Sequence, residues 1–352
     1  MVSGDAPHGD QRGHIGGRAA KDPPPAPGPG RDQAVRHCPG RRRSPRLDRK
    51  RARPVHAKEI AMTQSVVVGF DDTEHSAHAI TLAVREATAR NAVLRLLHAY
   101  QWIPPTTFGL PPGIATEQAV AEASRALLNT TAERLRAENA GLTVETVSVG
   151  GDPAGALADE GRDAALVVVG GRGRGGFAGQ LLGSVALRVL DRATCPVMIA
   201  RGAEAPATGR IMVGVDVDHP GGDAGLLEFA FAEAALRNAE VFAVHIWDDP
   251  TPLYARGGQF VDDIVEAVRA NRLRLLDAAL EPWVEKYPNV RVSRQAFPGT
   301  PSRMLVDSTR VVDMLVIGGL ARTEGHQGMR IGALAHTVLH HAHCPVIIVP
   351  ES

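Results

Sequence analysis

Short apolar runs alternate with longer amphipathic segments along the chain, beginning near residue 65. In the first half the apolar runs cover residues 65–70, 93–99, 142–148, 164–170 and 195–200. Between them, residues 74–90 and 115–140 place apolar side chains at three- and four-residue intervals, as amphipathic helices do. Nearly continuous apolar strands separated by helices are typical of a parallel sheet that is buried on both faces. The pattern therefore predicts a doubly wound, Rossmann-like α/β fold.

The same pattern occurs twice. The segment "SVVVGFDD" at residues 65–72 returns as "RIMVGVDV" at 210–217, and "VLDRATCPVMIA" at 189–200 returns as "VLHHAHCPVIIV" at 338–349. The offset between matching segments grows only from 145 to 149 residues. This repeat predicts two tandem copies of one domain, which we place at residues 62–203 and 208–352.

Residues 1–61 differ from the rest in composition. They are rich in Pro, Gly and Arg, as in "KDPPPAPGPGRD", and they lack apolar periodicity. Such a segment buries too little surface to offset its ordering entropy, so we expect it to be disordered. One interpretation is a basic tail for nucleic acid or an anionic membrane. We favour the other, that translation starts at Met62, where "MTQSVVVGFDD" begins like a complete domain.

A formal net charge of zero conceals an uneven distribution of charge. Residues 1–61 hold 14 Lys or Arg against 6 Asp or Glu, whereas residues 62–352 hold 25 against 33. A folded body with a balance of −8 repels nucleic acid, whose binding depends on cationic side chains. The three cysteines cannot form a disulfide framework, and no apolar run approaches the roughly 18 residues of a membrane span. We therefore expect a cytoplasmic protein.

Candidate binding residues follow the first and fourth predicted strands. In doubly wound sheets, ligands bind beyond the carboxyl ends of the strands, where the strand order reverses. The first strand ends at Gly69, with Asp71 two residues later, and the fourth ends in a glycine-rich turn at residues 170–173. The turn closes at Gly183-Ser184, before the apolar helix "VALRVL". Backbone N–H groups and a hydroxyl at a helix start suit an anion, so these residues predict a phosphate site facing an aspartate.

Three segments together resemble the universal stress protein family in its tandem two-domain form. They are "VVVGFDDTEHSAHAITLAVREA", the spacing Gly170-x2-Gly173-x9-Gly183-Ser184, and "CPVMIA". The spacing resembles the hallmark of the ATP-binding branch of this family, and the resemblance extends over residues 63–351. It implies that each domain has a five-stranded parallel sheet of order 3-2-1-4-5. It further implies that ATP, with or without Mg²⁺, lies across the ends of strands one and four.

The resemblance also assigns roles to single residues. It implies that the adenine or ribose lies near Gly69, Asp71 and Ala99. It implies that the phosphates lie against the turn and the following helix start, at Gly170, Gly171, Arg172, Gly173, Gly183, Ser184 and Val185. A carboxylate such as Asp71 can accept hydrogen bonds from a ribose hydroxyl or an adenine amine. The alternative is that Asp71 only caps the first helix and that the glycines only form a tight turn.

The second copy keeps part of this set, namely Gly214, Asp216, Ile246, Gly318 and Gly332. However, Ala321 replaces Gly173 and Ala333 replaces Ser184. A methyl group where the backbone must approach phosphate, and the loss of a hydroxyl, both weaken the site. We therefore expect strong nucleotide binding in the first copy and weak or no binding in the second.

Catalytic and metal-binding signatures are weak. No lysine follows the glycine-rich turn, as a P-loop nucleotidase requires, and no nucleophile is paired with a base at a readable spacing. His336, His340 and His343 lie at helical spacing, but without a further ligand type we expect exposed helix residues rather than a metal site. We therefore expect no enzyme beyond slow ATP hydrolysis.

The resemblance implies a nucleotide-dependent regulator in stress or dormancy. It also implies that the domains pair through their fifth strands and that the tandem chain forms a homodimer. Two alternatives stay open. One is an enzyme of the related nucleotide alpha-hydrolase group that hydrolyses or transfers a nucleotide. The other is an interaction module that binds no nucleotide.

Overall fold

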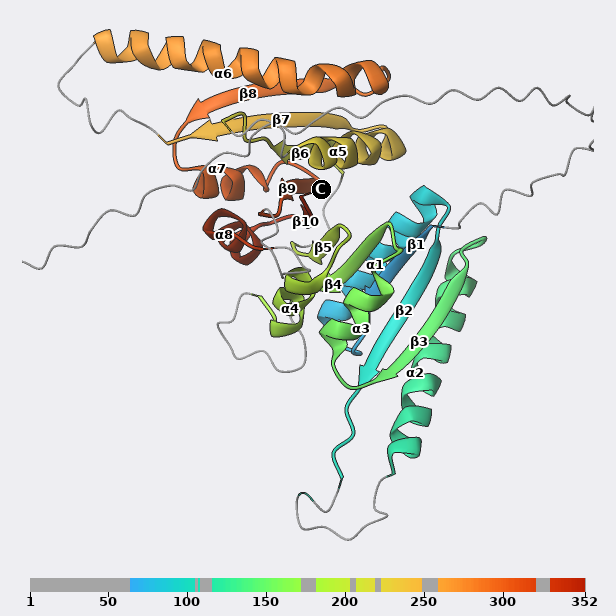
Figure 1. The fold of residues 1–352 in the computed structure, drawn as a ribbon. Coiled ribbons are helices and arrows are strands. Elements are labelled where there is room, and N and C mark those ends of the chain that lie inside the picture. The colour runs from blue at the N-terminus through green and yellow to red at the C-terminus, as the bar shows by residue number, and fades with distance from the viewer. Residues whose placement is uncertain are drawn as a thin grey trace, which may run out of the picture. The chain divides into compact units, whose positions relative to one another are not determined.

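The computed structural model describes residues 64–104, 107, 116–171, 182–202, 207–218, 223–248, 259–320 and 330–351. Ten strands and eight helices follow one another along these residues (Figure 1). The predicted tail lies outside these residues. The first half contains β1 (Ser65–Gly69), α1 (Glu74–Arg90), β2 (Val93–Tyr100), α2 (Glu117–Glu138), β3 (Val144–Gly150), α3 (Pro153–Glu160), β4 (Leu166–Gly170), α4 (Ser184–Arg192) and β5 (Val197–Ala200). The second half contains β6 (Arg210–Gly214), α5 (Ala224–Arg237), β7 (Glu240–Trp247), α6 (Gln259–Lys286), β8 (Val292–Pro298), α7 (Pro301–Ser308), β9 (Met314–Gly318), α8 (Ala333–His341) and β10 (Val346–Val349).

The strands form one sheet in the order β3-β2-β1-β4-β5-β10-β9-β6-β7-β8. Within each half all neighbouring strands are parallel and follow the order 3-2-1-4-5, which confirms the predicted fold. The halves meet where β5 and β10 pair antiparallel, with Val346 opposite Ile199. The pairing of fifth strands therefore occurs within one chain, and each half covers an edge that the other would leave exposed.

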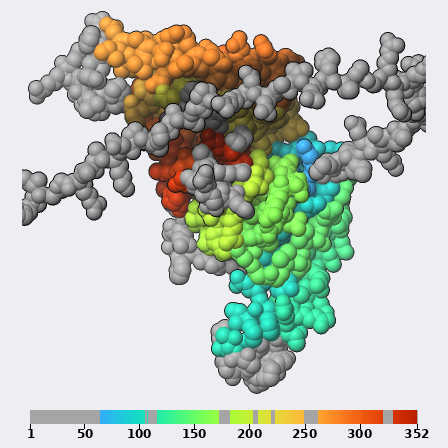
Figure 2. Space-filling model, in the orientation of Figure 1, coloured from blue at the N-terminus to red at the C-terminus, as the bar shows by residue number. Residues whose placement is uncertain are grey.

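Alternate residues of each strand pack on opposite faces of the sheet, because successive side chains of a strand point in opposite directions. Val66 and Val68 of β1 belong to a core cluster with residues of α1, α2, α5 and α6. Val67 between them belongs to a second cluster with residues of α3, α4, α7 and α8. Both faces are thus covered, as the continuous apolar strands predict. Figure 2 shows α6, in orange, on the surface of the second half.

The boundaries of α1 follow from its sequence. Thr73 caps the helix, and its hydroxyl accepts a hydrogen bond from the Ser76 N–H while the Ser76 hydroxyl accepts one from the Thr73 N–H. The helix ends at Asn91, whose φ of 51° is left-handed, and α5 ends in the same way at Asn238 with a φ of 50°. Asparagine tolerates this conformation better than most residues, so both copies turn into their second strand at an equivalent place.

Three of the predicted strands begin two residues later than expected. We predicted residues 142–148, 164–170 and 195–200, whereas β3 begins at Val144, β4 at Leu166 and β5 at Val197. The apolar residues before each strand belong to turns. The N–H of Ala164, for example, donates to the carbonyl of Gly161. Apolar composition alone does not distinguish a buried turn from the first residues of a strand.

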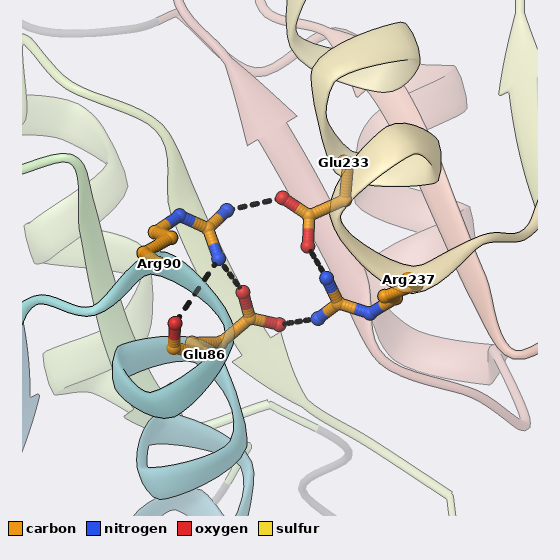
Figure 3. A network of polar contacts seen from close by, with 4 residues as sticks. All are labelled: Glu86, Arg90, Glu233 and Arg237. Carbon is orange, nitrogen blue, oxygen red and sulfur yellow. Dashed lines mark hydrogen bonds and ion pairs between the residues drawn. The ribbon is translucent and has the colours of Figure 1, made fainter. Parts of the chain in front are cut away.

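A closed ring of four charged side chains joins α1 to α5 across the two halves (Figure 3). Arg90 and Arg237 each pair with both Glu86 and Glu233. The side chains of both glutamates are at most 2% exposed, and that of Arg90 is 7% exposed. Because these pairs exclude most water, they are screened far less than surface pairs. The ring therefore links the two halves beside the β5–β10 junction.

None of the described helices is long and apolar enough to cross a membrane. The linker between the predicted domains lies between the end of β5 at Ala200 and the start of β6 at Arg210. Gly202 in this linker has a left-handed φ of 77°.

Candidate functional site

A cavity of about 610 Å³ opens at the carboxyl ends of β1, β2 and β4 and at the start of α4. Its volume lies within the range of small-molecule sites. Seven of the ten residues predicted for the first copy line it, namely Gly69, Asp71, Ala99, Gly170, Gly183, Ser184 and Val185. The structure thus brings together residues that lie more than a hundred positions apart in the sequence. They meet at the strand-order reversal because β1 and β4 are neighbours in the sheet.

The entry to α1 orients Asp71. Its Oδ1 accepts hydrogen bonds from the Thr73 N–H at 3.2 Å and from the Thr73 hydroxyl at 2.6 Å. Thr73 is the residue that caps the helix, and Asp71 holds Thr73 in place through these two hydrogen bonds. Its second oxygen, Oδ2, makes no hydrogen bond to the described residues and can accept one from a ligand hydroxyl or amine.

The start of α4 provides backbone donors. Gly183 has extended torsion angles (φ −75°, ψ 150°), and no side chain caps the helix. Its own N–H donates to the carbonyl of Gly171 at 2.8 Å, which ties the two ends of the glycine-rich turn together. The N–H groups of Ser184 and Val185 begin the helix, where the macrodipole carries about half a positive charge. This helix start, together with the Ser184 hydroxyl, can hold an anion inside the cavity.

The remaining predicted residues of the first copy do not line the cavity. Gly171 lies beside β5, and a Cβ atom there would approach the carbonyl oxygen of Ala200 to 3.1 Å. Gly171 therefore fits here because its backbone packs closely against the end of β5. Arg172 and Gly173 lie outside the described residues.

Helix α2 and strand β2 form another wall of the cavity. Ser124, Leu127 and Tyr100, which sequence reasoning missed, line it together with His98. The Nδ1 atom of His98 lies 2.8 Å from the Ser124 hydroxyl, which is 2.7 Å from the Ser148 hydroxyl. These bonds fix the imidazole beside the ligand space. The available signal was Ser124, a small polar residue on the buried stripe of α2.

The second half has a larger cavity of about 960 Å³ at the matching place. All five residues predicted for the second copy line it, namely Gly214, Asp216, Ile246, Gly318 and Gly332. Gly332 precedes α8 with extended torsion angles (φ −76°, ψ 171°), as Gly183 precedes α4. The backbone is thus alike in the two halves, and Ala333 stands where Ser184 stands in the first.

The two cavities differ most in charge. Asp71 is the only carboxylate among the described residues that line the first. Five carboxylates line the second, namely Asp216, Asp218, Asp223, Asp248 and Glu351. Burial, together with the nearby Asp216 and Glu351, raises the pKa of Asp223 to about 6. This negative field opposes phosphate binding in the second half. Ala321, the other substitution expected to weaken that site, lies outside the described residues.

The histidines and cysteines in the described part of the chain do not cluster as metal ligands. The rings of His336 and His340 lie 4.3 Å apart on α8. In the described parts of the chain, no group of three or more His, Cys, Asp or Glu side chains is suited to a metal ion. Cys195 and Cys344 are buried, and burial raises their thiol pKa values to about 11 and about 12. Both thiols are therefore protonated and unreactive near neutral pH.

Comparison with known proteins places the chain in a family. Residues 62–201 and 208–350 each match the model of the universal stress protein family. Universal stress protein Rv2623 of Mycobacterium tuberculosis is 32% identical over 305 residues, which cover 82% of this chain and 96% of that protein. A universal stress protein of Mycolicibacterium smegmatis is 30% identical over 298 residues, covering 83% of this chain and 98% of that protein.

A solved structure shares the fold. The crystal structure of a universal stress protein from Archaeoglobus fulgidus matches with a TM-score of 0.59 and 17% identity. The match covers 82% of this chain and 98% of that one, and at this identity it shows the fold alone. Since the family model matches both halves and the mycobacterial relatives match along most of the length, the chain belongs to the universal stress protein family.

Proposed function

We propose that the chain binds ATP in the cavity of its first half. The observation that carries this proposal is that the uncapped start of α4 and the carboxylate of Asp71 line one cavity. The N–H groups of Ser184 and Val185 would receive the phosphates, and Asp71 Oδ2 would accept a hydrogen bond from the ribose or adenine. Gly69 also lines the cavity, and a Cβ atom there would approach Leu157 of α3 to 3.1 Å.

We further propose that the bound nucleotide regulates the protein and is not turned over efficiently. Among the described residues that line this cavity there is no Lys or Arg to stabilise charge developing on a transferred phosphate. His98, the histidine in its wall, holds Ser124 through Nδ1 and is fixed by that bond. Slow ATP hydrolysis is compatible with this arrangement. Phosphate release at a rate typical of kinases, on the order of 1–100 per second, would instead support the enzyme alternative.

Titration calorimetry with ATP on two matched variants tests the site. Gly183→Glu and Gly332→Glu place the same side chain at equivalent extended positions, where the backbone accepts any residue. We expect the wild type to bind one ATP per chain, Gly183→Glu to lose binding, and Gly332→Glu to keep its affinity within about twofold, or roughly 0.4 kcal/mol. Two equal sites per chain, or unchanged binding in Gly183→Glu, would refute the proposal.

The nucleotide-free alternative has a direct test. Protein purified without added ligand is denatured, and the released small molecules are identified by mass spectrometry. We expect an adenine nucleotide. If none is released and the purified protein also fails to bind ATP, the chain is an interaction module without nucleotide.

We also propose that the chain forms a homodimer in the cytoplasm. Support comes from the family resemblance, and the β5 and β10 edges are already paired within the chain. A dimer therefore needs another surface. Light scattering after gel filtration should give twice the chain mass, and cell fractionation should recover the protein with cytoplasmic enzymes.

A further inference from the structure

Two arginines share one carboxylate beside the first cavity, between the neighbouring helices α3 and α4 (Figure 1). Asp152 Oδ2 lies 2.7 Å from Arg188 Nη2 and also pairs with Arg192 Nη1. Asp152 directly precedes Pro153, which lines the cavity. Arg188 follows Ser184, another lining residue, by four positions, which is about one helical turn. The three charged side chains therefore lie next to the ligand space, just outside its lining.

Within this cluster one negative charge faces two positive ones. The carboxylate of Asp152 also caps α3, where it accepts hydrogen bonds from the N–H groups of Ala154 and Gly155. Burial acts to raise the pKa of Asp152, but the hydrogen bonds from Arg192 and Ala154 and the charges of both arginines together lower it. Asp152 is therefore ionised near neutral pH, and it can balance one of the two arginines.

Arg188 has hydrogen-bond donors to spare. Helical side chains tilt toward the start of their helix, so Arg188 extends back along α4 toward the cavity. Its side chain is 49% exposed, and among the described residues it pairs with Asp152 alone. A guanidinium carries five N–H donors in a planar fork that fits a phosphate, and the contact with Asp152 occupies part of it. Because exposed ion pairs are weak, Arg188 can contact a phosphate and keep or release Asp152 at little cost.

The second half has different residues at the matching places. At the start of α7, Thr300 stands where Asp152 stands at the start of α3. On α8, Thr337 stands where Arg188 stands on α4, and its hydroxyl donates to the carbonyl of Ala333 at 2.9 Å, within its own helix. The charged cluster thus accompanies the cavity proposed for ATP and not its counterpart in the other copy of the fold.

We propose that Arg188 binds the phosphates of the nucleotide beyond the first, so that the first cavity selects nucleoside di- and triphosphates over monophosphates. This inference rests on the function proposed above. The first phosphate lies at the N–H groups of Ser184 and Val185, and the following phosphates extend past the lining to the guanidinium of Arg188. Asp152 holds Arg188 beside the cavity, and Arg192 balances Asp152, so the charge of Arg188 stays available to the ligand.

Calorimetry with ATP and with AMP on the full chain tests the proposal. Arg188→Gln removes an exposed cation, so the fold should persist, and ATP binding should weaken about tenfold, as for a lost charge-assisted hydrogen bond. AMP binding should change less than about twofold, because a single phosphate stays at the start of α4. Arg188→Lys keeps the charge without the planar fork and should weaken ATP binding less than Arg188→Gln does.

Arg162→Gln is the matched control. It removes the same charge from the same half, just beyond the end of α3, where Arg162 pairs with Asp159 and is 67% exposed. The affinities for ATP and AMP should both stay as in the wild type.

Three results would overturn the proposal. If the wild type binds both nucleotides and Arg188→Gln weakens them equally or leaves both unchanged, Arg188 is not a phosphate ligand, and the proposed nucleotide function stands. If Arg162→Gln changes the ratio of the two affinities as much as Arg188→Gln does, the effect comes from the overall charge and not from a contact. If the wild type binds neither nucleotide, the proposed function fails and this inference fails with it.

Discussion

Removing Arg90 tests whether the charged ring holds the two halves together. Arg90 pairs with Glu86 on its own helix and with Glu233 of the other half. In Arg90→Met the apolar stem remains, and the two buried glutamates share a single cation, Arg237. Removing one partner of a buried ion pair typically costs about 3–5 kcal/mol, because the other charge is left uncompensated. The side chains of Arg90 and Glu233 are 7% and 1% exposed, so the pair is buried and we expect Arg90→Met to cost about 3–5 kcal/mol.

The loss is measured by urea unfolding followed by circular dichroism. A destabilisation of about 3 kcal/mol lowers the midpoint of thermal unfolding by about 6 °C, taking about 2 °C per kcal/mol for a domain of this size. The control is Glu138→Gln on α2, which breaks an i,i+4 pair with Arg134 whose side chains are 53% and 56% exposed. Exposed pairs contribute at most about 1 kcal/mol, so the control should change little.

The dependence on pH gives a second readout. Burial and the neighbouring Glu86 raise the pKa of Glu233 to about 7, although Arg237 and Arg90 oppose the rise. Removing Arg90 raises this pKa again. A folded-state pKa above the unfolded value means that stability falls as pH rises through it, so the deficit of Arg90→Met should be larger at pH 8 than at pH 6. A loss no larger than that of Glu138→Gln at pH 8 would refute the role given to the ring.

Four further predictions concern single residues. Gly202→Ala should destabilise the fold by more than about 2 kcal/mol in urea unfolding, because the residue has a φ of 77° and its Cβ would overlap the His343 carbonyl oxygen. Gly209→Ala, with a φ of 71° and open space, should lose only about 1 kcal/mol, and equal losses would contradict the steric argument. Asp223→Asn should stabilise the fold by about 1–2 kcal/mol at pH 8 and not at pH 3, because a carboxyl pKa raised to about 6 by burial lowers stability from the ordinary carboxyl pKa upward until the folded pKa is passed. Iodoacetamide at pH 8 should leave Cys195 and Cys344 unmodified in the folded protein and label both in urea, because burial raises the pKa of both thiols. For the same reason the free energy of unfolding should decline above about pH 9, where the thiols ionise in the unfolded chain but not in the folded one. Asp71→Asn should keep the hydrogen bonds to Thr73 and weaken ATP binding about tenfold in calorimetry, whereas unchanged affinity would assign Asp71 to the helix entry alone.

Local patterns in the sequence were enough to predict the elements and their order. Residues 74–90, predicted as one amphipathic segment, coincide with α1. The agreement is close because the residues that start and end the helix, Thr73 and Asn91, lie directly beside the segment. The order of the strands came from the family resemblance and is confirmed by the sheet. The starts of three strands were misplaced by two residues, since apolar turn residues look like strand residues until hydrogen bonds are known.

Features that depend on contacts between the halves could not be predicted. Glu86 and Arg90 lie four residues apart on α1, which in a sequence indicates an exposed helix pair. Their burial follows from the packing of α1 against α5, between residues 143 and 151 positions apart. The bond of His245 Nδ1 with the carbonyl oxygen of Val215, 30 positions away, likewise requires atomic positions.

The residues that join the halves are distinct from those that line the cavities. The junction of β5 with β10 and the ring between α1 and α5 use equivalent residues from both copies, such as Glu86 and Glu233. The cavities diverge at the ends of β2 and β7, where Tyr100 and Gln101 line the first and Trp247 and Asp248 line the second. None of these four residues belongs to the junction or the ring. Substitutions in one cavity can therefore change its ligand while the paired halves, and the other cavity, keep their structure.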